Sequence, residues 1–179
     1  MDLSKLKIQE SECACVICSY MCRAPCCGTP SEMKDLIDSG YANRLSFEGL
    51  DAVPCIMPSL KGNEGENVPY RNFSSVGCTF WRHGLCELHD LKKKPIAGRY
   101  AHHSQNINDA DELCEILDEM WKSDEGKQVI RLWKKIRRKR KLLKTWKYEQ
   151  KDFTPDPKNF YCIFTEKNED NTCGSKENH

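Results

Sequence analysis

The sequence predicts a small protein of an irregular α+β fold class that is rich in helices. Three observations support this prediction. Twelve cysteines occur in 179 residues, and six of them lie between positions 13 and 27. Short stretches near positions 55 and 80 have the composition of strands, and the segment from 108 onward carries apolar residues at helical spacing. We therefore expect a cysteine-rich region with a short β-hairpin, followed by amphipathic helices.

Composition and charge divide the chain into three parts. We predict a cysteine-rich domain over residues 1–107, a helical region over 108–150 and a partly disordered tail over 151–179. Residues 127–151 hold 12 basic and 1 acidic side chains, whereas residues 1–126 hold 13 basic and 20 acidic ones. The strongly basic character is therefore confined to one short segment of a mildly acidic chain.

The cysteine run has a spacing that favours metal binding. Cys15, Cys18 and Cys22 follow the pattern C-x2-C-x3-C, and Cys26 and Cys27 come four residues later. A C-x2-C step lets one tight turn direct two sulfur atoms to the same point, as zinc and iron–sulfur sites require. The alternatives are a disulfide framework and a set of buried free thiols.

The cellular compartment affects the choice between metal binding and disulfide formation. Residues 1–12 contain no apolar segment of the signal-peptide type, and no stretch of the sequence approaches 18 apolar residues. We therefore expect a cytoplasmic protein without a membrane span, in which cysteines bind metal more often than they form disulfides.

A helix is expected directly after the cysteine run. The sequence Thr29-Pro30-Ser31-Glu32 is a capping box, three apolar residues follow at helical spacing, and Gly40 suits the helix end. The positive end of this helix would favour thiolates at Cys26 and Cys27. Further along, Val53 to Met57 predicts a short strand in which Cys55 is as readily a buried thiol as a ligand.

A β-hairpin is expected between residues 78 and 88. Strands over Cys78–Trp81 and Leu85–Leu88 would be joined by a turn at Arg82–Gly84. This hairpin would bring Cys78 and Cys86 together as a second pair of metal ligands. His89 follows Cys86 at a metal-like spacing and is a further candidate. With Cys13 the ligand cysteines number eight, enough for two four-cysteine sites or for one cluster with spares, and zinc and an iron–sulfur cluster are both left open.

Two amphipathic helices complete the prediction. Residues 108–121 have a regular apolar stripe, with Asp109 and Glu112 as a capping box. A second helix begins near Ser123 and is basic, with eleven Lys and Arg and no acidic residue over 126–148. It could bind nucleic acid or another polyanion through Lys134, Lys135, Arg137, Arg138, Arg140 and Lys141. The alternative is a solvated helix face that packs on the acidic N-terminal part.

The order of the cysteine blocks resembles the YkgJ family of zinc- or iron-chelating domains. The first family block reads C-x2-C-x3-C-C and is followed by a helix carrying a glutamate. Cys15, Cys18 and Cys22 match this block, Arg23 stands where its last cysteine belongs, and Glu32 follows.

The second family block reads C-x-F-L, then C-x-I-Y-x2-R-P-x2-C-R. It corresponds here to Cys78-Thr79-Phe80-Trp81, Cys86-Glu87-Leu88-His89 and Lys94-Pro95, with Gly98 in place of the last cysteine. The resemblance covers about residues 13–103 and implies metal binding without a particular reaction. The departures from the family pattern leave open which cysteines share a metal.

The sequence therefore predicts a cytosolic metal-binding protein that holds zinc or an iron–sulfur cluster. The candidate ligands are Cys15, Cys18, Cys22, Cys26, Cys27, Cys78 and Cys86. One alternative is a nucleic-acid-binding protein with a structural metal site, and another is an iron–sulfur redox or modification enzyme. No catalytic residues are predicted, because the sequence holds no Gly-rich phosphate loop and no H-E-x-x-H motif.

Overall fold

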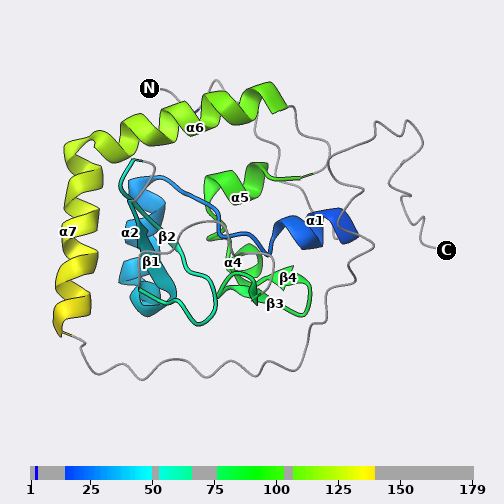
Figure 1. Cartoon of the computed structure of the whole chain (residues 1–179), viewed down its shortest axis with the longest axis horizontal. Coiled ribbons are helices and arrows are strands. Elements are labelled where there is room, and N and C mark those ends of the chain that lie inside the picture. The colour runs from blue at the N-terminus through cyan, green and yellow to red at the C-terminus, as the bar shows by residue number, and fades with distance from the viewer. Residues whose placement is uncertain (1–2, 4–14, 50–52, 66–75, 103–106, 140–179) are drawn as a thin grey trace.

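The structure is a computed structural model that describes residue 3 and residues 15–49, 53–65, 76–102 and 107–139. It contains helices and two pairs of antiparallel strands, which confirms a small α+β protein (Figure 1). The elements in chain order are α1 (Val16–Met21), α2 (Pro30–Asp38), the 3-10 helix η2 (Tyr41–Arg44), β1 (Leu45–Glu48), β2 (Cys55–Pro58), β3 (Trp81–Arg82), β4 (Leu85–Cys86), α4 (Glu87–Asp90), α5 (Ile96–Tyr100), α6 (Ile107–Lys122) and α7 (Asp124–Lys139).

The predicted capping box begins α2 as expected. The Glu32 amide donates to the Thr29 hydroxyl at 3.1 Å, and the Thr29 amide donates to the Glu32 carboxylate at 2.9 Å. These two hydrogen bonds satisfy amides that would otherwise lack partners at the start of the helix. Met33, Leu36 and Ile37 form the buried face of α2.

Strands β1 and β2 form an antiparallel ribbon in which Leu45 pairs with Pro58 and Glu48 with Cys55. The expected strand at 53–57 is present as β2, which begins two residues later and ends one residue later than expected. Strand β1 was not predicted, because four residues following a 3-10 helix carry too little alternation to identify a strand.

The hairpin of β3 and β4 exists but is shorter than predicted. Its strands contain two residues each, and His83 and Gly84 between them both have positive φ angles, as a two-residue type I′ turn requires. Cys78 precedes the hairpin and forms an isolated bridge with Leu60. Residues 87 and 88, which were expected in the second strand, begin helix α4 instead.

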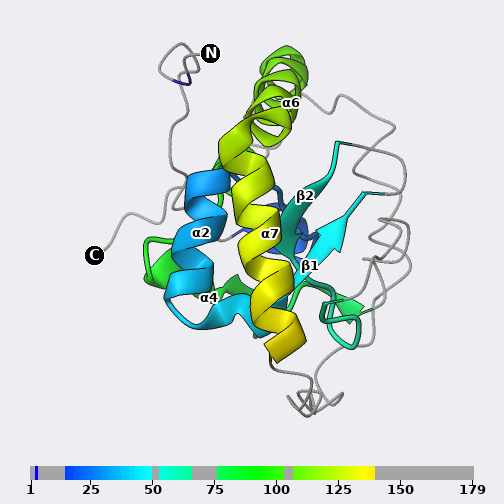
Figure 2. The same ribbon diagram turned by 90° about the vertical axis from the view of Figure 1, so that its left-hand side faces the viewer.

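Helices α6 and α7 are the last two elements of the described fold. Helix α6 begins at Ile107, so Asp109 lies inside the helix and is not its cap, contrary to expectation. Helix α7 lies beside α2 and against β2 (Figure 2). The buried Trp133 of α7 donates its indole N–H to the Ala42 carbonyl at 2.9 Å. The apolar face predicted for this helix therefore packs on the main core.

Several predictions lie outside the described residues. They concern Cys13, the basic residues Arg140 and Lys141, and the tail over 151–179. Among the described helices, none combines the length and apolar character needed to cross a membrane.

Candidate metal centre

Four cysteines from separate parts of the chain lie close enough to affect one another's protonation. We call Cys22, Cys26, Cys78 and Cys86 the thiol cluster. Burial raises the pKa of the Cys26 thiol well above its ordinary value, and the neighbouring thiols of the other three cysteines raise it further. Cys22 also acts on Cys86, and Cys86 acts on Cys78. The structure thus brings four of the seven cysteines predicted as ligands near one another, although among the described residues no three of them are grouped closely enough to hold an ion.

Cys22 enters the cluster from the end of helix α1. Its backbone N–H donates to the Cys18 carbonyl at 3.1 Å, so Cys22 is the C-cap of the helix. The Ser19 hydroxyl on the same helix donates to the Gly84 carbonyl at 2.5 Å. This hydrogen bond joins α1 to the turn between β3 and β4 and so holds Cys22 near the hairpin.

Cys78 is held by backbone hydrogen bonds to a distant segment. Its N–H donates to the Arg23 carbonyl at 2.7 Å, which places Cys78 directly beside the residue that follows Cys22. The buried Arg23 guanidinium lies over the Trp81 ring at 5.1 Å. Arg23 joins the two cysteine segments through its backbone and its side chain.

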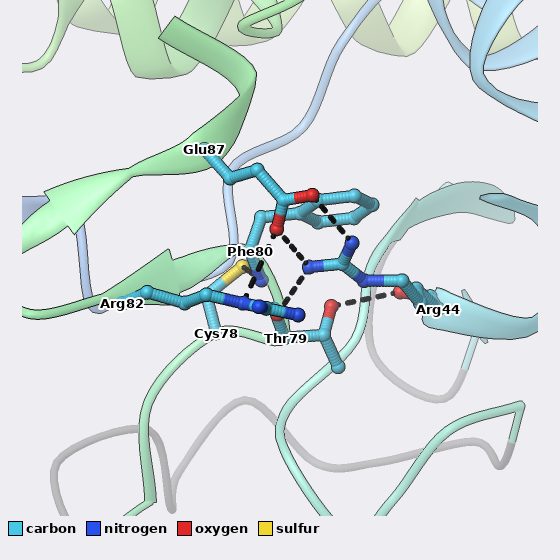
Figure 3. Close-up of polar contacts among 6 residues, drawn as sticks. All are labelled: Arg44, Cys78, Thr79, Phe80, Arg82 and Glu87. Atoms are coloured by element: carbon cyan, nitrogen blue, oxygen red, sulfur yellow. Dashed lines mark hydrogen bonds and ion pairs between the residues drawn. The ribbon is translucent and has the colours of Figure 1, made fainter. Parts of the chain in front are cut away.

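The residue after Cys86, Glu87, forms an ion pair with Arg44 (Figure 3). The buried Arg44 donates two hydrogen bonds to the Glu87 carboxylate, at 3.0 and 2.7 Å, and a third to the Thr79 carbonyl at 2.6 Å. The Thr79 hydroxyl donates back to the Arg44 carbonyl at 3.0 Å. Arg44 therefore connects the residue after Cys78 with the residue after Cys86, and its charge lowers the pKa of Glu87.

The sulfur atoms lie in a buried setting that also offers hydrogen-bond donors. Burial raises the pKa of Cys78 to about 12, while the Phe80 amide, 3.5 Å from the Cys78 sulfur, opposes the increase. Burial likewise raises the pKa of Cys86, and the amides of Leu88 and His89 oppose it. Amides directed at sulfur stabilise thiolates, the form in which cysteine binds metal.

Lys94 places a positive charge beside the thiol cluster. Its ammonium donates to the Cys22 sulfur at 3.4 Å, and it acts to lower the pKa of Cys26 and of Cys86. Lys94 was not among the residues predicted from the sequence to form the site. Gly98 lies on the same side: a Cβ atom there would be 2.6 Å from the Cys26 sulfur.

Helix α5, which contains Gly98, is fixed to the start of α2 by Glu32. The Glu32 carboxylate accepts hydrogen bonds from Arg99 at 2.6 Å and from the Ile96 amide at 3.2 Å. These contacts are in addition to its capping of α2. One side chain therefore orders both the segment that follows Cys26 and the helix that packs on Cys26.

Cys15, Cys18 and Cys27 are the other three cysteines predicted as ligands. The thiol of Cys27 donates to the Gly28 carbonyl at 3.6 Å, and the interaction with the Cys55 thiol is the main cause that lowers the pKa of Cys27. Cys18 is buried within α1, and Cys15 is the half-buried N-cap of that helix. His89 is exposed on α4. No sequence signal indicated that Cys27 and Cys55 are neighbours, because 28 positions separate them.

The donor set of the thiol cluster fits a thiophilic metal. Four sulfur donors are the set that closed zinc sites use, and iron–sulfur clusters also take four cysteines. Within the described ranges, no three Cys, His, Asp or Glu side chains are already grouped to hold an ion. Binding would therefore require the four thiols to close on the metal.

Helix α7 carries the basic residues predicted to bind a polyanion. Lys134, Lys135, Arg137 and Arg138 are exposed. Lys134 lies over the Phe47 ring at 4.1 Å and Arg137 over the Trp133 ring at 5.1 Å. Among the residues whose positions are described, no carboxylate forms an ion pair with any of these four cations.

Comparison of the chain with family models, with curated proteins and with solved structures finds no match.

Proposed function

We propose that this protein binds a thiophilic metal ion through the thiol cluster, with Cys22, Cys26, Cys78 and Cys86 as its ligands. The observation that carries the proposal is the convergence of these cysteine segments. The Cys78 amide donates to the carbonyl of Arg23, the residue after Cys22, at 2.7 Å. The Lys94 ammonium donates to the Cys22 sulfur at 3.4 Å, and a Cβ atom at Gly98 would meet both the Lys94 side chain and the Cys26 sulfur. The core of a protein does not need four neighbouring thiols, because other small apolar residues fill space without the reactivity of cysteine.

A single tetrahedral ion such as Zn²⁺ is the form of metal that we propose. The tight contact between Gly98 and the Cys26 sulfur supports a compact site, since an iron–sulfur cluster needs more room than one ion. Four thiolates and one Zn²⁺ carry a net charge of two negative units, and the Lys94 ammonium offsets part of it. A reducing compartment such as the cytosol would keep the thiols available.

The role proposed for the metal is structural. Cys78 and Cys86 belong to the main core, and Cys22 packs against it, so a bound ion would connect three segments of that core. In small proteins with structural zinc, the free energy of metal binding contributes directly to folding.

The proposal is tested by titrating Zn²⁺ into the full-length protein against a chromophoric chelator, under anaerobic and reducing conditions. Serine replacements of Cys22, Cys26, Cys78 and Cys86 are each expected to abolish the tightest binding event and to lower the melting temperature of the metal-loaded protein. Cys114→Ser is the matched control, because Cys114 is exposed on α6. Retention of that binding event by all four variants would refute the assignment.

A second candidate function is binding of a polyanion such as nucleic acid by α7. The observation that favours it is the exposed group of four cations that pair with no carboxylate in the described part of the fold. Neutralisation of phosphates would make binding steeply dependent on salt.

This candidate is tested by fluorescence anisotropy with random duplex and single-stranded oligonucleotides. The wild type is expected to bind at low salt and to lose about a thousandfold or more in affinity between roughly 50 and 200 mM salt if six or more phosphates are contacted. Lys135→Gln with Arg138→Gln should weaken binding and reduce the salt slope, whereas Lys92→Gln with Lys93→Gln, outside α7, should not. No binding at the low-salt end would exclude this function.

A further inference from the structure

Phe47 of β1 is an aromatic residue that lies beside the basic face of α7. Strand β1 is paired with β2, and α7 lies against β2 (Figure 2). The Lys134 ammonium of α7 lies over the Phe47 ring, 4.1 Å from its centre. Phe47 borders the main core and is only half-buried. An aromatic ring and a cation therefore share one surface of the fold.

The position of the Phe47 ring depends on a glycine that follows β1. A Cβ atom at Gly49 would be 2.8 and 2.9 Å from two carbon atoms of the ring, which is too close for a side chain. The Gly49 amide donates to the Glu48 carboxylate at 3.0 Å. The backbone at position 49 therefore borders one edge of the ring, while the face of the ring is covered by the flexible side chain of Lys134.

The exposed cations of α7 form a row that includes Lys134. Positions 131, 134, 135 and 138 follow the spacing i, i+3, i+4 and i+7, which places them on one face of a helix. We call the exposed residues at these positions the cation row: Arg131, Lys134, Lys135 and Arg138. At about 1.5 Å per residue, the row is about 10 Å long. A row of this length meets only a few phosphates, so phosphate contacts alone would bind weakly.

We propose that Phe47 and the cation row form a surface that binds single-stranded nucleic acid, with phosphates at the row and a base stacked on the Phe47 ring. This inference rests on the polyanion binding proposed for α7 and adds the class of strand that is bound. Single strands present the faces of their bases to aromatic side chains, whereas a duplex keeps its bases stacked inside. As a base stacks on Phe47, the Lys134 ammonium exchanges the ring for a phosphate.

The charge of the ligand alone would favour the opposite choice. A duplex carries a higher density of negative charge than a single strand, so a surface that binds only phosphates prefers the duplex. A stacked base adds about 5- to 150-fold to the affinity for a single strand. Stacking requires no particular base, because every base has an aromatic face. The preferred strand therefore shows whether Phe47 takes part in binding.

The test is fluorescence anisotropy with the full-length protein at low salt and labelled ligands of equal length. The ligands are an oligothymidine, an abasic oligomer with the same phosphates and no bases, and a duplex. The wild type is expected to bind the oligothymidine about 5- to 150-fold more tightly than the abasic oligomer, and more tightly than the duplex. An oligouridine of the same length shows whether RNA or DNA is the tighter ligand.

Two results would overturn the proposal in different ways. Equal affinity for the oligothymidine and the abasic oligomer, or tighter binding of the duplex, would show that only phosphates are bound and would leave the polyanion binding of α7 in place. Absence of binding by every ligand would remove both the stacking surface and the polyanion binding of α7.

Three variants separate the base contact from the phosphate contacts. Phe47→Leu should bind the oligothymidine no more tightly than the abasic oligomer, whereas Phe47→Tyr, which keeps the ring, should retain the preference. Lys135→Gln should weaken the binding of both oligomers by a similar factor. A Phe47→Leu protein that melts as the wild type does and still prefers the oligothymidine would overturn the assignment of Phe47.

A cross-linking measurement on the wild type covers the case in which Phe47→Leu does not fold. A strand carrying 5-iodouracil is bound and irradiated, and the linked peptide is identified by tandem mass spectrometry. The peptide is expected to contain Phe47. Cross-links confined to other segments of the chain would overturn the proposal.

Discussion

At the scale of single residues, Lys94 is the side chain on which the electrostatics of the proposed centre depend. A set of four thiolates in a partly buried site carries more negative charge than a divalent ion can neutralise. The Lys94 ammonium, 3.4 Å from the Cys22 sulfur, offsets part of the excess negative charge and donates a hydrogen bond to one ligand. Partners of this kind orient ligands and adjust metal affinity.

We therefore predict that Lys94→Gln weakens Zn²⁺ binding by about 10–100-fold, measured by competition with a chromophoric chelator. Lys94→Arg should retain most of the affinity, because it keeps the positive charge. Lys93→Gln provides the control, since it removes the same charge at the adjacent position. Equal affinities for the Lys94→Gln and Lys93→Gln proteins would show that Lys94 has no special role.

Cys26 and Cys27 show what cannot be predicted from the spacing of cysteines in the sequence. Spacing alone grouped Cys26 with Cys27, and the structure places their sulfur atoms in different surroundings. A Cβ atom at Gly98 would be 2.6 Å from the Cys26 sulfur, whereas the Cys27 thiol donates to the Gly28 carbonyl at 3.6 Å. Which thiols a cysteine meets depends on how distant segments pack, and local spacing does not contain that information.

At the scale of elements, the hairpin region depends on the ion pair between Arg44 and Glu87. The Arg44 side chain is 3% exposed and the Glu87 side chain 30% exposed, so solvent reaches the ion pair mainly at Glu87. Two hydrogen bonds join the guanidinium to the carboxylate, and the Phe80 ring lies 3.9 Å from the guanidinium carbon. A buried guanidinium that loses its anionic partner retains the cost of its desolvation.

Glu87→Gln is accordingly expected to destabilise the protein by about 1–3 kcal/mol, measured as a change in the free energy of unfolding by chemical denaturation. Asp90→Asn is the control, because Asp90 is an exposed acid on the same helix, α4. If the two variants were equally stable, Arg44 would not depend on the Glu87 charge.

Elements whose sequence signal lies within a few consecutive residues were predicted well. The capping box at Thr29 is made by four consecutive residues, so the start of α2 could be read from the sequence. The hairpin was located, but its strands are shorter than their composition suggested, because Cys78 pairs with Leu60 and residues 87–90 turn into a helix. Pairings between distant residues decide such boundaries, and alternation in the sequence does not record them.

At the scale of the whole molecule, the proposed metal centre is continuous with the main core. That core holds residues of α2, of both strand pairs and of α6 and α7, together with Cys78 and Cys86. The sequence predicted the apolar faces of α2 and α7 from their periodicity, and these faces do meet. It could not predict which cysteines join the same core, since that follows from the assembly of all these elements.

X-ray absorption spectroscopy of the full-length protein loaded with one equivalent of Zn²⁺ under reducing conditions tests the central claim most directly. The four-thiol assignment predicts a first shell of four sulfur atoms at about 2.3 Å and no lighter neighbour. A protein carrying Cys78→Ser and Cys86→Ser should lose sulfur neighbours from this shell. A wild-type shell containing nitrogen or oxygen at about 2.0–2.1 Å, or an unchanged sulfur shell in the double variant, would contradict the claim that these four cysteines bind the metal.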